Sequence, residues 1–182
     1  MNHKSLFFKY VIPSIIAFAL SGIYAIVDGY FVGNTIGDAG LSAINIAYPI
    51  DALIQALGTG IGMGGAVYYS INAAEKKGKR AEEFIATSWW LLVIVSVIST
   101  IIIYSFSSKI LGLLGADGII LTNATDYIKI IALGAILQIL GTGMMPFIRN
   151  YGNSFWSMFA MVGGFITNIV LDFIFVWIYE MG

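Results

Sequence analysis

Cysteine is absent from this 182-residue chain, and histidine occurs once, as His3 before the first apolar run. Without thiols the chain has no disulfide framework, no thiolate metal site and no thiol nucleophile. A histidine-based metal site or catalytic dyad needs further partners, which a single histidine does not have. No nucleophile–base pair or phosphate-binding loop is present either. We therefore expect a protein that is not an enzyme and that holds no cofactor or firm metal site.

Charged residues are also scarce, at 10% of the chain against 59% hydrophobic residues, and the formal net charge is −1. A soluble domain is about 25% charged and 45–50% apolar. The mean hydropathy of +0.89 is far too high for a soluble surface. No basic excess is available for a nucleic-acid partner. Soluble, disordered and nucleic-acid-binding classes are excluded, and the composition indicates an integral membrane protein surrounded by lipid.

Long apolar runs are abundant. A membrane helix needs about 20 mostly apolar residues, and five stretches of that length are present: about 10–33, 41–72, 84–107, 124–148 and 155–179. They are too long for barrel strands and lack period-two alternation. The sequence predicts an all-α integral membrane fold, with five transmembrane helices in one transmembrane domain over residues 1–182. Loops are expected at Asn72–Glu83 and Ser108–Asn123.

The lysines and arginines predict the orientation, because cytoplasmic loops are enriched in them. With a cytoplasmic N-terminus, only Lys109 and Lys129 fall on the outer side. The other seven are cytoplasmic: Lys4, Lys9, Lys76, Lys77, Lys79, Arg80 and Arg149. We expect a multi-pass cell-membrane protein with its N-terminus in the cytoplasm. Because the odd number of spans ends at the edge of an apolar helix, we also expect a fragment of a larger protein, roughly twice as long or longer.

Five glycines crowd the second span: Gly58, Gly60, Gly62, Gly64 and Gly65. Residues 60–65 match G-x-G-x-x-G, but a dinucleotide site needs a preceding strand and a βαβ unit, and neither is predicted. The pairs Gly58/Gly62 and Gly60/Gly64 have the small-xxx-small spacing of close helix packing. A glycine-lined helix can also slide, bend or border a cavity, so packing and a mobile role both remain open.

Two carboxylates, Asp28 and Asp172, lie within the first and fifth spans. A carboxylate near the bilayer centre costs about 3 kcal/mol, so it normally faces a cavity or a partner. Each is about 17 residues from the cytoplasmic start of its span, or roughly 25 Å along the helix. Two acids at the same depth are able to line one chamber.

Each of these acids has a polar companion one turn earlier, Tyr24 before Asp28 and Asn168 before Asp172. Residues four apart share a helix face. A carboxylate beside a phenol or an amide can take up a proton or bind a small cation such as Na⁺ through oxygens. The alternative is a hydrogen-bond clamp between helices with no role in transport.

A third intramembrane acid, Asp51, lies about ten residues into the second span, with Gln55 one turn later. The pair is able to extend a polar path and so to belong to a cation-coupling or substrate site. It is equally able to serve as a contact with a neighbouring helix.

Several segments, taken in order, resemble the multidrug and toxic compound extrusion (MATE) transporters. Each motif is weak alone, but the ordered set runs through nearly the whole chain. The matching segments are Val27–Gly33 with Ile36-Gly37 and Leu41–Ala43, Pro49-Ile50 with the glycines of 58–65, Ile148–Asn153, and Asn168–Asp172 with Ile174-Phe175.

This resemblance implies twelve helices in two six-helix lobes, of which the chain supplies most of the first and lacks its sixth helix. It implies antiport of protons or sodium ions against amphipathic or cationic drugs, and a partner lobe that completes the transporter. It also implies that Asp28, Asp172, Tyr24 and Asn168 form the cation-coupling site of the first lobe.

Thr142 and Met145 stand where related sequences often carry asparagines, so proton and sodium coupling both remain open. Two other functions compete with drug antiport. One is a flippase for lipid-linked precursors from the same superfamily, although acidic rather than basic intramembrane residues favour cationic cargo. The other is a structural membrane subunit without transport activity.

Overall fold

The structure is a computed structural model that describes residues 3–35, 37–152 and 154–179. Within these ranges the backbone alone is described for residues 3–6, 9, 10, 24, 25, 28, 31, 32, 34, 35, 176 and 177.

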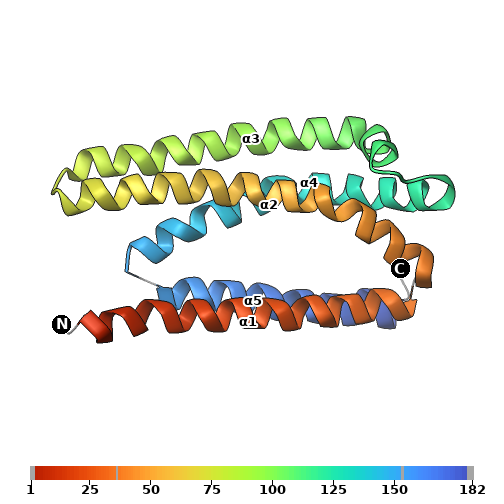
Figure 1. Ribbon diagram of the computed structural model, residues 1–182, viewed down its shortest axis with the longest axis horizontal. Helices are drawn as coiled ribbons and strands as arrows, with labels where there is room; N and C mark the ends of the chain where they lie inside the picture. Colours follow the sequence, from red (N-terminus) through yellow and green to blue (C-terminus); the bar gives the residue numbers. More distant parts are fainter. Residues whose placement is uncertain (1–2, 36, 153, 180–182) are drawn as a thin grey trace. The chain divides into compact units, whose positions relative to one another are not determined.

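Five long helices make up nearly all of the described chain, and none of these residues forms a strand (Figure 1). The helices are α1 (His3–Thr35), α2 (Gly37–Ala74), α3 (Gly78–Leu113), α4 (Gly118–Asn150) and α5 (Ser154–Asp172), and a π-helical segment, η1 (Phe173–Ile178), follows α5. The predicted all-α fold is confirmed.

Four helical stretches are long and apolar enough to cross a membrane: α2, α3, α4 and Ser154–Phe175. In α1 the apolar stretch among the described residues is shorter, Val11–Ile23. A bilayer leaves no water for exposed backbone groups, so continuous helices, with every interior hydrogen bond made locally, satisfy the chain there.

The prediction of two long loops was wrong, because both connections are short turns. Helix α2 continues to Ala74 and α3 begins at Gly78, while only residues 114–117 separate α3 from α4. A helix does not stop where its apolar run stops, because Ala, Lys, Arg and Glu all favour the helical backbone. Helix α3 ends at Leu113, and Gly115 follows two residues later with a φ of +96°, in the left-handed region. There the Ala116 N–H donates to the Leu111 carbonyl at 3.0 Å, as in a Schellman motif.

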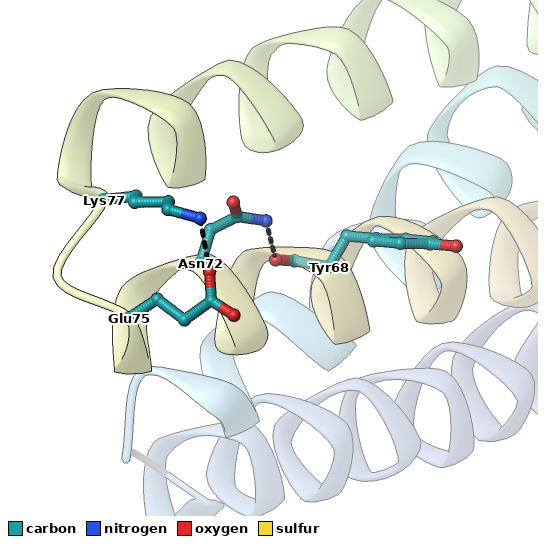
Figure 2. Close-up of polar contacts among 4 residues, drawn as sticks. All are labelled: Tyr68, Asn72, Glu75 and Lys77. Atoms are coloured by element: carbon teal, nitrogen blue, oxygen red, sulfur yellow. Dashed lines mark hydrogen bonds and ion pairs between the residues drawn. The ribbon is translucent and has the colours of Figure 1, made fainter.

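The turn between α2 and α3 is held by side chains as well as backbone (Figure 2). The Asn72 amide donates to the Tyr68 carbonyl at 2.8 Å, and Lys77 Nζ forms an ion pair with Glu75 Oε2 at 2.6 Å. The hydrogen bond from Lys77, and then its positive charge, lower the pKa of the exposed Glu75 carboxyl. Lys76 takes the left-handed conformation, with φ of +59°, although it is not a glycine.

The chain divides into two compact units. The terminal unit contains Met1–Leu41 and Tyr151–Gly182, in which α1 lies along α5 (Figure 1). The central unit contains Ser42–Asn150, in which α3 packs along α4. A hydrophobic core cluster of buried residues lies in the central unit: Ala43, Ala47, Ile50, Ile54, Leu92, Ile103, Leu111, Ala116, Ala124, Ile128, Ala132, Ala135 and Ile139.

Three glycines allow α2 to approach its neighbours closely. A Cβ at Gly58 would lie 2.8 Å from the Ile139 carbonyl oxygen, and one at Gly62 would lie 2.6 Å from the Gly143 carbonyl carbon, both on α4. A Cβ at Gly65 would meet Ser88 of α3 and Phe147 of α4. All three positions are too close to a neighbour for a side chain. At Gly58 and Gly62 the backbones of α2 and α4 pack directly, and at Gly65 the α2 backbone packs against side chains.

Gly60 and Gly64 differ from these three glycines. A Cβ at either position would have no atom of the described residues within 4 Å. The predicted Gly60/Gly64 packing pair is therefore not formed within the central unit. A helix presents only one face to a neighbour, and these two positions lie on another face.

Candidate ion-coupling and substrate sites

In the terminal unit, Asp172 and Asn168 lie one turn apart on α5, and both are half-buried. Helix α5 lies along α1, the helix that carries the other two predicted site residues. The side chains of Tyr24 and Asp28 lie outside the described residues, so their predicted roles stay predictions. The structure does place the two helices of the predicted site side by side.

Asn168 has a buried side-chain oxygen that can accept a hydrogen bond but accepts none from the described residues. Its Oδ1 oxygen is out of contact with water and accepts no hydrogen bond from the described residues. Leaving such an acceptor unsatisfied costs about 1–3 kcal/mol. A proton donor or a small cation would relieve that cost, so the oxygen fits the predicted use as a cation ligand.

Asp172 lies at the junction between α5 and the π-helical segment η1. The wider turn continues through a hydrogen bond from the Tyr179 N–H to the Ile174 carbonyl at 3.1 Å, five residues back. Such turns shift the register of the side chains that follow them and are frequent at functional sites. The apolar segment Phe173–Ile178 gives no sequence signal for this change.

In the central unit, Asp51 of α2 contacts Gln138 of α4. The Gln138 Nε2 group donates to Asp51 Oδ1 at 3.0 Å, and both residues are half-buried. Sequence reasoning allowed Asp51 a contact with a neighbouring helix but did not identify its partner, which lies 87 residues away. Gln55 does not join this contact; its side chain is exposed, one turn further along α2.

No group of three or more metal-ligating His, Asp or Glu side chains is found among the residues whose side chains are described. The fold and the intramembrane carboxylates define a helical membrane protein with polar groups placed inside its apolar spans. A protein-family model described as MatE matches residues 13–174, and the chain belongs to this family.

Curated relatives are similar to nearly the whole chain. The multidrug export protein MepA of Staphylococcus saprophyticus is 32% identical over 186 residues, covering 98% of this chain and 40% of the relative. MepA of Staphylococcus aureus is 29% identical over 170 residues, covering 93% of this chain and 38% of the relative. The chain thus spans about 40% of the length of these relatives.

Solved structures of transporters are also similar to nearly the whole chain. A MOP superfamily transporter from Pyrococcus furiosus matches with a TM-score of 0.92 and 26% identity, over 98% of this chain and 39% of the other. A multidrug resistance MATE family transporter in an outward-facing conformation matches with a TM-score of 0.91 and 26% identity. The match covers 97% of this chain and 39% of the transporter chain.

Proposed function

We propose that this chain is the first-lobe part of a secondary antiporter that exports amphipathic or cationic compounds in exchange for protons or sodium ions. The observation that carries the proposal is Asn168, whose buried oxygen lies one turn from Asp172 on the helix that packs along α1. Membership of the MatE family and the similarity to multidrug exporters support it.

The coupling site comprises Asp28 and Tyr24 on α1 and Asn168 and Asp172 on α5. Carboxylate and amide oxygens can hold a sodium ion, and a carboxylate can equally hold a proton. If the cargo binds better to one ion-loaded form of the site, each ligand changes the affinity for the other by the same factor. Exchange across the membrane follows when the site opens alternately to the two sides.

Alternating access needs two halves that move around a shared site. The remaining part of the relatives, absent from residues 1–182, would supply the second half. We propose that residues 1–182 expressed alone do not export drugs. Efflux by cells that make only this segment, measured with a fluorescent organic cation, would contradict that proposal.

The protein lies in the cell membrane with its N-terminus in the cytoplasm. The turn between α2 and α3, which carries Lys76, Lys77, Lys79 and Arg80, then faces the cytoplasm, as the distribution of basic residues favours. The chain lacks cysteine, so a Lys77→Cys variant gives a single reactive thiol. An impermeant thiol reagent should not label it in intact cells but should label it in inverted vesicles.

The coupling role is tested by Asp28→Asn and Asp172→Asn in the full-length protein. Both changes keep the size of the side chain, so folding and membrane insertion should be retained. Uptake of an organic cation into inverted vesicles, driven by a pH or sodium gradient, should fall at least tenfold. Asp126→Asn, at an exposed position of α4, is the matched control and should transport normally. Wild-type ion dependence in both site variants would favour the clamp interpretation.

A further inference from the structure

A stripe of polar and aromatic side chains runs along one face of α2. It consists of Tyr48, Asp51, Gln55 and Thr59, spaced by three, four and four residues. This spacing places all four on a single helix face. They lie within one of the long apolar helices, where each polar group needs a reason to be present. We call this set the α2 stripe.

Asp51 lies at the edge of the stripe where α2 meets α4. The hydrogen bond from Gln138 fixes one carboxylate oxygen, and Gly58 brings the α2 backbone against Ile139 of α4 two turns further on. An ionised carboxylate has about four acceptor sites, so one amide donor leaves most of them available. Within the part of the chain that the structure describes, no lysine or arginine forms an ion pair with Asp51.

Two of the other three side chains of the stripe are exposed. The Tyr48 side chain is 66% exposed, and Gln55 is also exposed. An amide that faces hydrocarbon without a hydrogen-bond partner costs several kcal/mol, about 2–7 by transfer measurements. This face of α2 is therefore unsuited to contact with lipid tails, and suits water or a ligand with a complementary charge.

We propose that the α2 stripe is a recognition site for a monovalent organic cation. The Asp51 carboxylate, held by Gln138, supplies the opposing charge. The ring of Tyr48 supplies an aromatic face for a cation, and Gln55 supplies an amide for hydrogen bonding. The proposal rests on the proposed export function. It assigns cargo selection to the central unit, separately from the coupling residues of the terminal unit.

Equilibrium binding to the purified full-length protein tests the proposal, at fixed pH and sodium concentration and without a gradient. The probes are tetraphenylphosphonium, a permanent cation, and Nile red, which is neutral. Asp51→Asn retains an acceptor for Gln138 but removes the charge. It should weaken tetraphenylphosphonium binding about tenfold and leave Nile red binding unchanged, whereas Asp51→Glu should largely restore cation binding.

Tyr48→Leu provides a second variant in case Asp51→Asn does not fold, because Tyr48 is exposed and its replacement leaves the helix contacts intact. It should weaken cation binding about threefold to fivefold. Asp126→Asn removes one carboxylate elsewhere and should change neither probe. Wild-type tetraphenylphosphonium affinity in folded Asp51→Asn would overturn the proposal. Equal weakening of both probes, or a Tyr48→Leu variant that loses thermal stability but not cation binding, would also overturn it, since the stripe would then be a packing surface.

The results that would contradict the export proposal differ from those that would contradict the recognition site. If Asp28→Asn and Asp172→Asn both keep ion-driven uptake while Asp51→Asn loses cation binding, the coupling site is wrong and the recognition site stands. If the terminal-unit variants lose ion dependence while Asp51→Asn binds normally, the recognition site is wrong and the coupling site stands.

Discussion

The terminal and central units differ in how their helices are held. In the central unit, α2, α3 and α4 share a core of small and aliphatic residues, and glycines bring backbones into direct contact. In the terminal unit, the buried positions of α5 are two serines, Ser154 and Ser157. The most apolar 18-residue window of its stretch Ser154–Phe175 contains no buried residue.

The polar groups differ in the same way. In the central unit three of them bond across helices: Gln138 with Asp51, Asn150 with the Ala66 carbonyl at 2.9 Å, and Thr100 with the Ala132 carbonyl at 3.0 Å. In the terminal unit, Asn168 has a buried oxygen without a hydrogen-bond donor among the described residues. Thr125 of the central unit also has a buried side-chain oxygen without a hydrogen-bond partner among the described residues. The units therefore differ in the number of hydrogen bonds between helices, and not in which of them has a group available for a ligand.

The largest expected effect comes from filling a glycine contact in the central unit. In Gly62→Ala the new methyl group would meet the Gly143 backbone, which cannot move aside as a flexible side chain would. Overpacking of this kind costs about 1–3 kcal/mol. The matched control is Gly60→Ala, where the added Cβ meets nothing within 4 Å. Thermal unfolding of the full-length protein in detergent should show a lower Tm for Gly62→Ala only, and equal Tm values would contradict direct backbone packing.

The next effect compares a polar residue that is hydrogen-bonded to another helix with one whose buried oxygen has no hydrogen-bond donor among the described residues. Asn150→Ala removes the hydrogen bond to the Ala66 carbonyl and should lower stability by about 1 kcal/mol, without altering the ion dependence of transport. Asn168→Leu replaces an oxygen without a donor by an apolar group, so stability should be unchanged or slightly higher. Its ion-driven uptake should nevertheless fall. Unfolding curves and vesicle uptake measured on both variants check this contrast, and a destabilised Asn168→Leu protein would show that the amide has a structural partner.

A smaller gain is expected at the α2–α3 turn. Lys76 holds a left-handed backbone conformation that costs a side-chain-bearing residue about 1–2 kcal/mol. In Lys76→Gly that strain is removed, but the extra freedom of glycine in the unfolded chain offsets part of the gain. The Tm should rise slightly. Lys79→Gly, at the start of α3, is the control and should lower it, because glycine is a poor helix former.

The smallest effect is the pH dependence of the Glu75–Lys77 pair. Because the folded-state pKa of Glu75 is lowered, the pair contributes stability above the ordinary glutamate value of 4.5 and loses it as the pH falls through the folded value. The pair is exposed and salt-screened, so the contribution is slight. Glu75→Gln should lower the Tm slightly at neutral pH in low salt, and this difference in Tm should shrink as the pH falls below 4.5. A difference that persists at low pH would mean that Glu75 acts through something other than its charge.

The sequence by itself determined the helical membrane class, the approximate positions of the spans and the family resemblance. These follow from local properties: the length of each apolar run must match the bilayer, and helices satisfy their backbone hydrogen bonds within the run. The intramembrane acids were also evident from the sequence, because a charge inside an apolar run is conspicuous whatever lies around it.

The tertiary structure alone decided which groups meet. The pairing of Asp51 with Gln138 joins residues 87 apart, and neither helix specifies it alone. The five glycines within residues 58–65 of α2 looked alike in sequence, but the packing direction of α4 and α3 selects Gly58, Gly62 and Gly65 and leaves Gly60 and Gly64 open. The hydropathy pattern also did not predict the short turns between α2 and α3 and between α3 and α4, or the π-helical segment after Asp172. Helix formation is governed by neighbours along the chain, whereas contacts depend on which faces the packed helices turn toward one another.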